Sequence, residues 1–314
     1  MSSRIPSQQV LVTGIGGHFG RAVARRLHRR HDLIGVDRRE IDDLPRDIEL
    51  EHVDIRRRAM EDIFRRRDID AVIHLNIMHD PRTRQEEHHD FNIAGTKKIV
   101  ELCAEHRVPK VTVLSSANVY GPDPANDQFL TEEAPLMGGQ NFGMIRDLIA
   151  LDMFCNSFFW RHPEIETVIL RPVHIVGRVN NAPSRFLRLE RPITILGFDP
   201  MVQLIHVEDL VTAIELSLTP GIRGVYNVAG PSPVPLSLLL DRLGRDPVAL
   251  PEPVARAALE AGWSLRLTNW PVPEIDHIKY VCMVDDSRAR EELGFSHEHG
   301  IDEILAEVEK MPLL

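Results

Sequence analysis

The sequence predicts an α/β protein built on a doubly wound, parallel β-sheet with a smaller C-terminal lobe. Short β-branched runs alternate with helical stretches over the first two-thirds of the chain. The strand-like runs, such as "AVIHLNI", are almost continuously apolar, which is typical of parallel strands that are covered on both faces. A glycine-rich turn also joins the first predicted strand directly to the first predicted helix.

The elements follow one another in a regular order. In the first helix, Phe19, Val23 and Leu27 recur every four residues and mark one buried face. The predicted strands lie at 10–14, 33–37, 71–77, 110–116 and 167–177, and the predicted helices at 18–30, 88–106 and 142–162. Such an alternation indicates βαβ units and therefore a parallel sheet.

The rhythm changes after residue 172, where proline becomes frequent. We therefore predict a first domain over 1–172, which contains the sheet, and a looser lobe over 173–202 and 231–314. The segment 203–230 contains "QLIHVEDLVTAIELSL" and "GVYNVAG", and we expect both to return to the main sheet.

Composition limits the classes of function. The formal net charge of −10 argues against a nucleic-acid partner, because phosphate binding requires a basic face. No apolar stretch approaches the length of a membrane span. The three cysteines show no CxxC spacing, which suggests reduced, buried thiols in a cytoplasmic protein, and the first ten residues do not resemble a signal peptide.

The glycine turn "TGIGGHFG" has the spacing of a dinucleotide-binding loop. Gly14, Gly17 and Gly20 allow a tight turn, close approach to a pyrophosphate, and packing of the helix on its strand. Asp37 ends the next strand 23 residues after Gly14, where a carboxylate accepts the ribose hydroxyls of NAD. Arg38 and its neighbour Arg39 are suited to the extra phosphate of NADP instead; we favour NAD.

With these residues the chain resembles the extended short-chain dehydrogenases, the NAD-dependent epimerase/dehydratase family. Further motifs carry the resemblance: "HVDI" near the adenine, "NIAGT" behind the active site, "LSSANVYG", "LRPVHIVG" and "DDSRAREELGF". It implies a Rossmann-type sheet, a substrate-binding lobe and a homodimer formed through two helices. Ser116 falls at the family's catalytic serine. The resemblance implies cofactor contacts from Gly14, Gly17, His18, Phe19, Gly20, Asp37, Arg38, Asp54, Ile55, Leu75, Asn92, Ser115 and Pro172.

The stretch "GGQNFGMIRDLIALD" departs from that family. Its chemistry uses a Tyr-x-x-x-Lys pair on one helix face, in which the lysine lowers the pKa of the tyrosine and the tyrosine moves a proton. Two registers are open: Phe142 and Arg146, or Met144 and Leu148. We prefer the second, because the family has an acidic residue four positions after the lysine, where this chain has Asp152. Both registers lack the phenol.

Two hypotheses follow for function. The first is an NAD(H)-binding protein with a degenerate catalytic site that acts as a sensor or regulator. The second is an active NAD-dependent epimerase, dehydratase or dehydrogenase that uses a substitute acid or base on a nucleotide sugar or another hydroxylated substrate. Whether the chain is an enzyme therefore stays open at this point.

Several histidines are candidates for the substitute group. His79 and Asp80 follow a strand end, although a plain polar loop is the favoured interpretation. A metal cluster of His79 with His88 and His89 is discounted, because adjacent histidines on a helix point in different directions, and we predict no metal site. His174 is interpreted as a partly buried core histidine rather than a pocket residue.

Overall fold

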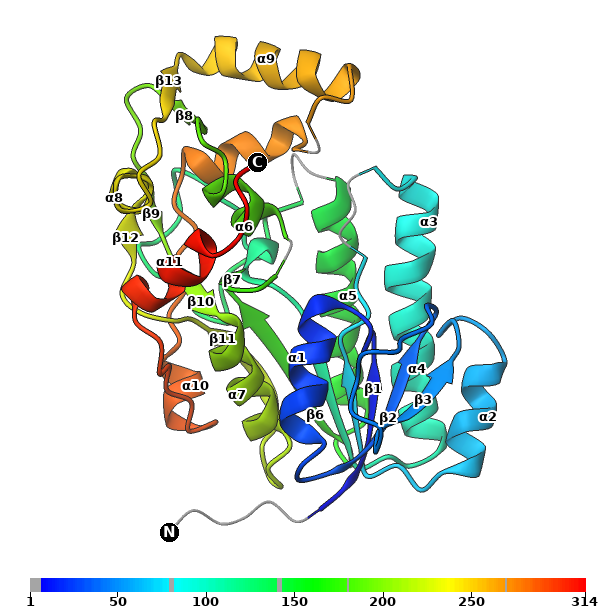
Figure 1. The fold of residues 1–314 in the computed structure, drawn as a ribbon. Helices are drawn as coiled ribbons and strands as arrows, with labels where there is room; N and C mark the ends of the chain where they lie inside the picture. The colour runs from blue at the N-terminus through cyan, green and yellow to red at the C-terminus, as the bar shows by residue number, and fades with distance from the viewer. Residues whose placement is uncertain (1–6, 79–81, 140–142, 180, 269) are drawn as a thin grey trace.

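The computed structural model describes residues 7–78, 82–139, 143–179, 181–268 and 270–314. Its main domain is a sheet of seven parallel strands in the order β11-β6-β5-β4-β1-β2-β3 (Figure 1). The strands are β1 (Gln9–Thr13), β2 (Asp32–Asp37), β3 (Glu49–His52), β4 (Ala71–His74), β5 (Lys110–Leu114), β6 (Glu166–Pro172) and β11 (Gly224–Val228). The predicted doubly wound parallel sheet is therefore confirmed.

Helices cover both faces of this sheet. On one face lie α1 (His18–Leu27) and α7 (Val207–Ser217), which pack against each other. On the other lie α2 (Ala59–Arg66), α4 (Gly95–Glu105) and α5 (Gly143–Arg161). The short α3 (Gln85–His89) leads into α4 and contacts α5. Successive side chains of each strand point to opposite faces of the sheet. Both faces are buried, so the strands contribute residues to both apolar clusters.

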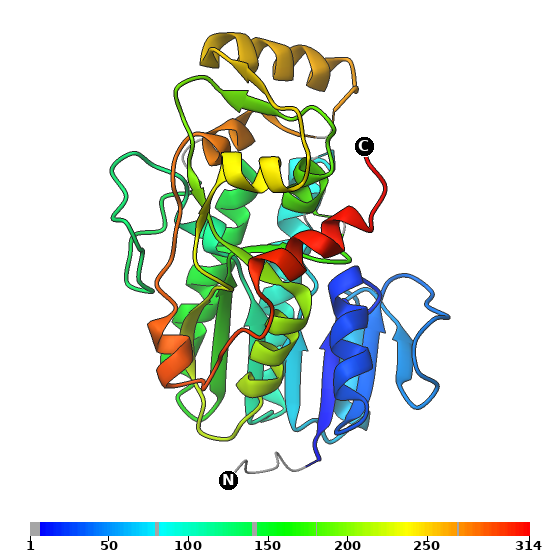
Figure 2. The same cartoon turned by 60° about the vertical axis from the view of Figure 1, so that its left-hand side comes forward.

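The C-terminal lobe sits over the carboxyl ends of the strands (Figures 1 and 2). It contains three two-stranded sheets and its own apolar core. Its paired strands are β7 (His174–Val176) with β10 (Leu204–His206), β8 (Ile193–Ile195) with β13 (Val248–Leu250), and β9 (Met201–Val202) with β12 (Val234–Pro235). Its helices are α6 (Ala182–Leu187), α8 (Leu236–Arg242), α9 (Glu252–Ser264) and α11 (Ile301–Glu309), while α10 (Ser287–Glu291) contacts β11.

One prediction about the returning segment is wrong. Strand β11 and helix α7 return to the main domain as expected, but β10 does not join its sheet. The edge beside β6 is filled by β11 from Gly224 to Val228, so β10 pairs with β7 beyond the end of the sheet. The proposed boundaries of the two lobes stay a prediction.

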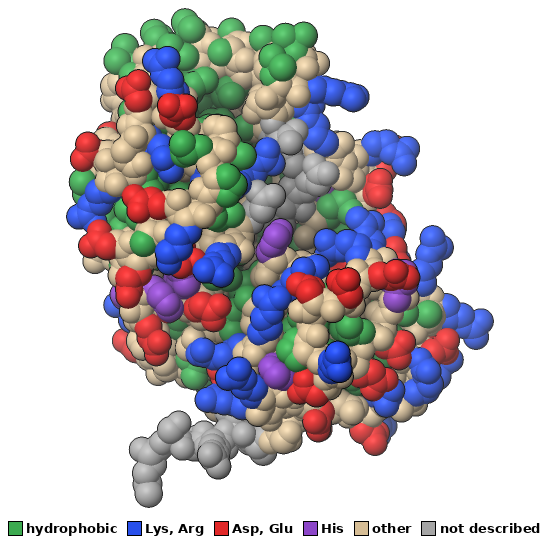
Figure 3. Space-filling view, in the orientation of Figure 1, with side chains coloured by type: hydrophobic (Ala, Val, Ile, Leu, Met, Phe, Trp, Pro, Cys, Tyr) green, Lys and Arg blue, Asp and Glu red, His purple; other side chains and the backbone are tan. Residues whose placement is uncertain are grey.

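Two further expectations concern cysteines and membranes. Cys103 and Cys155 are buried free thiols, whereas Cys282 is partly exposed, so the expectation of three buried thiols is wrong for that residue. Within the described ranges, no helix combines the length and the apolar character needed to cross a bilayer. Figure 3 shows apolar side chains gathered on top of the C-terminal lobe, around α9.

Candidate functional site

The candidate site is the crevice beyond the carboxyl ends of β1 and β4, where the strand order reverses. Gly14 follows β1 directly with a φ of +74°, and a Cβ there would lie 3.0 Å from the Cα of Asn76 after β4. A Cβ on Gly20 would lie 2.3 Å from the carbonyl oxygen of Gly14, so α1 packs directly on the turn. Gly17 precedes the exposed His18, where α1 begins and offers unpaired N–H groups to an anion.

Asp37 lies beside this turn and is fully hydrogen-bonded. Its Oδ2 accepts from the backbone N–H of Gly16 at 3.0 Å, and both oxygens accept from the guanidinium of Arg39. Burial alone raises the pKa of Asp37, but the bonds from Arg39 and Gly16 outweigh it and hold that pKa below its usual value. The carboxylate is thus an anion positioned to accept hydroxyl groups.

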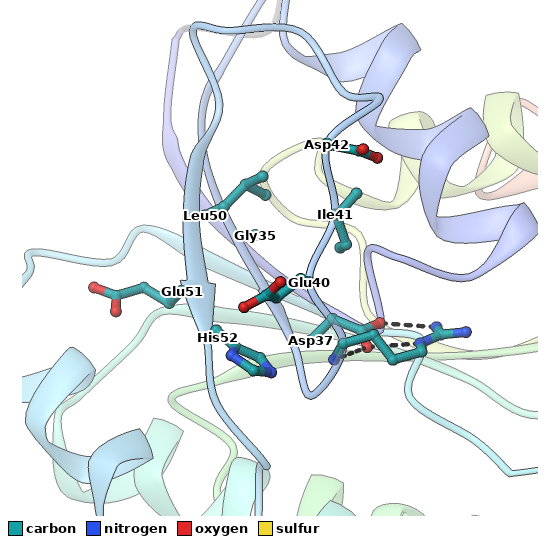
Figure 4. Close-up of a pocket in the computed structure, with 9 residues that line it drawn as sticks. Gly35, Asp37, Glu40, Ile41, Asp42, Leu50, Glu51 and His52 are labelled. Carbon is teal, nitrogen blue, oxygen red and sulfur yellow. Dashed lines mark hydrogen bonds and ion pairs between the residues drawn. The ribbon is translucent and has the colours of Figure 1, made fainter.

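A hollow of about 600 Å³ opens next to Asp37, between β2, β3 and the loop that joins them (Figure 4). The apolar side chains of Ile41 and Leu50 line it, and Glu40, Asp42 and Glu51 add carboxylates. The sequence did not predict this hollow, because the loop carries no motif and the exposed edge strand β3 ("ELEH") has too few apolar residues to be recognised as a strand.

Asp54 repeats the arrangement at the end of β3. Arg56 binds both of its oxygens, at 3.0 and 2.6 Å, and also pairs with Asp90 at 2.6 Å. The guanidinium groups of Arg56 and Arg38 both lie just over 5 Å from the ring centroid of Phe91. The predicted adenine end of the crevice is therefore lined by cations that already have partners.

The remaining predicted contacts are positioned by neighbouring strand ends. Asn92 accepts a hydrogen bond from the N–H of Met78 at 2.7 Å and donates to its carbonyl oxygen at 3.1 Å, which fixes the chain after β4. Leu75 and Phe19 are half-buried, while Ile55 is fully buried in the apolar core beside α2.

The serine motif follows β5, and its two serines, Ser115 and Ser116, form different hydrogen bonds. The hydroxyl of Ser115 donates to Asp152 at 2.6 Å, and Arg171 binds both oxygens of the same carboxylate. Ser115 is therefore engaged inside the protein. Ser116 caps a short turn, where its Oγ accepts a hydrogen bond from the N–H of Asn118 at 3.1 Å. Pro172, another predicted cofactor contact, is the buried last residue of β6.

Helix α5 carries neither tyrosine nor lysine from Gly143 to Arg161. Leu148 is 3% exposed within the apolar cluster that contains the turn after Ser116, and Met144 is half-buried. Arg146 is exposed, and its Nε donates to the carbonyl oxygen of Gly139 at 2.7 Å. Phe142 lies outside the described residues.

Comparison with known proteins settles the family. The sequence model described as "NAD dependent epimerase/dehydratase family" matches residues 10–229, which is more than half of the chain. This chain belongs to that family. The match begins in β1 and ends just after β11, so it spans the whole seven-stranded sheet.

Relatives of this family member are distant. An uncharacterized protein of Mycobacterium tuberculosis (strain ATCC 25618 / H37Rv) is 27% identical over 255 residues, covering 79% of this chain and 67% of the relative. UDP-glucose 4-epimerase of Thermotoga maritima, solved with UDP-glucose, has a TM-score of 0.76 at 20% identity, covering 96% of this chain and 97% of that one. UDP-glucose 4-epimerase of Thermus thermophilus, solved with NAD, has a TM-score of 0.75 at 17% identity and covers 96% and 98%.

One prediction about the histidines, that His88 and His89 point in different directions, is wrong. His88 and His89 do converge, because their Nδ1 atoms lie 2.9 and 2.7 Å from the two oxygens of Asp147 on α5. Adjacent side chains on the short α3 therefore reach one carboxylate, which bridges them from the neighbouring helix. In the described part of the chain no three such side chains form a possible metal site. His79 and Asp80 lie outside the described residues.

His174 is partly buried, as the sequence predicts, and it also faces a small hollow. It lines a hollow of about 20 Å³ with Ala117 and Asn118 of the serine motif and with His277 and Tyr280 of the lobe. The sequence signal was its position two residues after Pro172, beyond the carboxyl end of β6. His277 carried no signal, because its segment has no motif.

Proposed function

We propose that this chain is an NAD(H)-binding family member in which the tyrosine–lysine chemistry is lost, and that it acts as a sensor or regulator responsive to NAD(H). The observation that carries the proposal is helix α5, where Met144 and Leu148 stand at the preferred positions of the pair. The family relation and the NAD complex of the Thermus thermophilus neighbour support NAD as the ligand. Asp37 favours NAD over NADP, because its charge repels a 2′-phosphate.

Two of the three tyrosines, Tyr120 and Tyr226, do not replace the missing phenol. Tyr120 donates to Asn227 and accepts from Arg171, and burial raises its pKa to about 12. Tyr226 donates to Arg223, and burial raises its pKa to about 12 as well. Without a positioned acid or base, proton transfer slows by about a hundred- to ten-thousand-fold.

A second candidate function is an active enzyme with a substitute group. Two imidazoles, His174 and His277, line the hollow beside the turn that Ser116 caps, which favours this alternative. Its substrate is then a nucleotide sugar, as in the Thermotoga maritima neighbour, or another hydroxylated compound. The proposal also includes a cytoplasmic location, which the free cysteines support. It includes a homodimer as well, which the exposed Met153 and Trp160 on α5 support.

Calorimetric titration with NAD⁺, NADH and NADP⁺ tests the proposal. We expect micromolar binding of NAD(H), weaker binding of NADP⁺, and a clear preference between NAD⁺ and NADH if the protein is a sensor. Conversion of UDP-glucose or dTDP-glucose to an epimer or a dehydrated product, or net reduction of NAD⁺ by either sugar nucleotide, supports the second candidate instead. Binding of none of the three dinucleotides contradicts both.

A further inference from the structure

Arg82, on the segment between β4 and α3, contacts the C-terminal lobe. Its guanidinium lies over the indole ring of Trp263, with Cζ 3.5 Å from the ring centroid. Its Nη2 donates to the carbonyl oxygen of Trp263 at 3.1 Å and to that of Thr268 at 2.5 Å. Trp263 belongs to the last turn of α9, and Thr268 follows this helix. Figure 1 shows the chain after α9 descending toward the segment that precedes α3.

These contacts suit the end of a helix. The last carbonyl oxygens of a helix have no partner within it, and the partial negative charge there attracts a cation. An arginine stacked on a tryptophan ring adds a cation–π interaction, which is strongest for this ring. Arg82 makes both kinds of contact with one side chain, and both Arg82 and Trp263 are half-buried. A lysine lacks the planar face and the fork of donors, so the arrangement is specific to a guanidinium.

A second attachment of the lobe lies on the side of β11. Val284 pairs with Leu130, and the carbonyl oxygen of Asp285 accepts from the amide of Asn227 in β11. Arg82 follows β4, which is three strands from β11 in the sheet, a separation of about 14 Å. When Arg82 releases α9, the attachment near β11 remains, and the lobe can rotate about it as about a hinge.

The segment that carries Arg82 also borders the cofactor crevice. Asn92 binds both the N–H and the carbonyl oxygen of Met78, which precedes Arg82 by four residues. Four residues span at most about 14 Å, so Met78 and Arg82 cannot move far independently of each other. A dinucleotide that contacts the residues after β4 therefore acts on the segment from which Arg82 extends.

We propose that the contacts of Arg82 with Trp263 and Thr268 form a latch that closes the C-terminal lobe over the cofactor crevice. The latch opens to admit a dinucleotide and closes behind it, so it slows release of the bound dinucleotide. A bound dinucleotide favours the closed latch because it fixes the segment after β4. This inference rests on the proposed function, since NAD(H) is the occupant of the crevice, and it supplies the change in the lobe that a sensor requires.

Stopped-flow fluorescence of NADH tests the latch by measuring the association and dissociation rate constants. We expect Arg82→Ala to raise the dissociation rate constant about tenfold, since it removes a cation–π contact and two hydrogen bonds that hold the lobe closed. Trp263→Leu removes the stacked ring and should act in the same direction. The double variant should be no faster than Arg82→Ala, because both substitutions break one contact. The control Arg84→Ala changes an exposed arginine of the same segment and should leave both rate constants unchanged.

Acrylamide quenching of Trp263 fluorescence reports on the latch without NADH. The measurement uses protein with Trp160→Phe and Trp270→Phe, in which Trp263 is the remaining tryptophan. We expect Arg82→Ala to increase the quenching in ligand-free protein, because it uncovers one face of the ring. Addition of NAD⁺ should decrease the quenching when Arg82 is present and should not when alanine replaces it. Thermal unfolding establishes that each variant is folded.

Three results overturn the latch while NADH still binds. They are wild-type dissociation rate constants in both Arg82→Ala and Trp263→Leu, an equal acceleration by Arg84→Ala, and a quenching of Trp263 that NAD⁺ does not change. Absence of NADH binding to the wild-type protein instead overturns the proposed function. In that case the ligand-free quenching still decides whether Arg82 holds the lobe closed, and equal quenching with and without its side chain overturns the latch as well.

Discussion

The guanidinium of Arg39 covers both carboxylate oxygens of Asp37, with Nε 3.0 Å from Oδ1 and Nη2 3.0 Å from Oδ2. A ribose hydroxyl must share this carboxylate with Arg39 or displace it. Displacement is feasible, because the Arg39 side chain is 60% exposed and can move into water, while the ribose hydroxyls replace it as hydrogen-bond donors to the buried Asp37. Arg39 therefore keeps the Asp37 carboxylate hydrogen-bonded, and the hydroxyl groups of a dinucleotide can take its place.

Asp37→Ala should weaken NADH binding by about ten- to a hundredfold, since hydrogen bonds to a charged group contribute about 1.5–3 kcal/mol. Arg39→Ala is the matched control: it keeps the carboxylate and should change NADH affinity by less than about threefold, while it weakens any residual NADP⁺ binding. Calorimetry on both variants provides the measurement. Wild-type NADH affinity in Asp37→Ala means that the ribose does not contact this carboxylate.

Leu148→Lys should destabilise the fold by on the order of 3 kcal/mol, because it buries an unpaired charge where an apolar side chain packs. Leu148→Met conserves volume and should cost less than about 1.5 kcal/mol. Urea unfolding compares the two. An unfolding free energy of Leu148→Lys equal to that of the wild type would mean that the lysine side chain reaches the crevice. Packing around this position would then be compatible with the family's lysine.

Asp152→Asn should cost about 3–5 kcal/mol of unfolding free energy, because it leaves the buried guanidinium of Arg171 without its counter-charge. Both side chains are essentially inaccessible, and Ser115 donates to the same carboxylate. Asp62→Asn on α2, where the partner Arg65 is exposed, is the control and should change stability by less than about 1 kcal/mol. Equal effects of the two substitutions contradict the role given to Asp152.

The main sheet was predictable because its strands are apolar runs bounded by turns, and because Gly14, Gly17 and Gly20 fix the first crossover. The edge strand β3 was not, since "ELEH" contributes one apolar side chain in four residues. The lobe's strands are only two or three residues long, which is too short for a period to appear. Pairing of β10 with β7 depends on which sheet edge is already occupied, and local sequence does not contain that information.

The candidate site also contains residues that the sequence predicts and contacts that it does not. Positions fixed by a local turn, such as Gly14 and Asp37, were identified from spacing alone. Partners brought together by tertiary packing were not: Asp147 between two histidines, and His277 against His174. Each of these contacts joins residues at least 58 positions apart in the sequence. Over such a separation the sequence pattern does not indicate which residues lie close in space.

Acid should destabilise the protein through His174 and His277. The unfolded chain binds these protons near pH 6.5, whereas the folded chain binds them only near pH 4 and pH 3, because burial lowers both pKa values. The stability they contribute is therefore complete above pH 6.5 and is lost as the pH falls toward 4. We expect a loss on the order of 2 kcal/mol for each histidine between pH 7 and pH 4.5 that the double variant His174→Phe/His277→Phe does not show. Urea unfolding across this range decides it, and identical slopes in the two proteins contradict the assignment.

Trp160→Glu should convert a dimer into monomers. Trp160 and Met153 are 74% and 60% exposed on α5, a large apolar exposure for a helix whose other face is buried against the sheet. A second copy of the chain covering α4 and α5 removes this surface from water, and a carboxylate at its centre opposes that association. Sedimentation velocity measures the change, with Leu267→Glu, at a side chain 79% exposed on the C-terminal lobe, as the matched control that should leave the dimer intact. A monomeric wild type, or dissociation caused only by Leu267→Glu, contradicts an interface on α5.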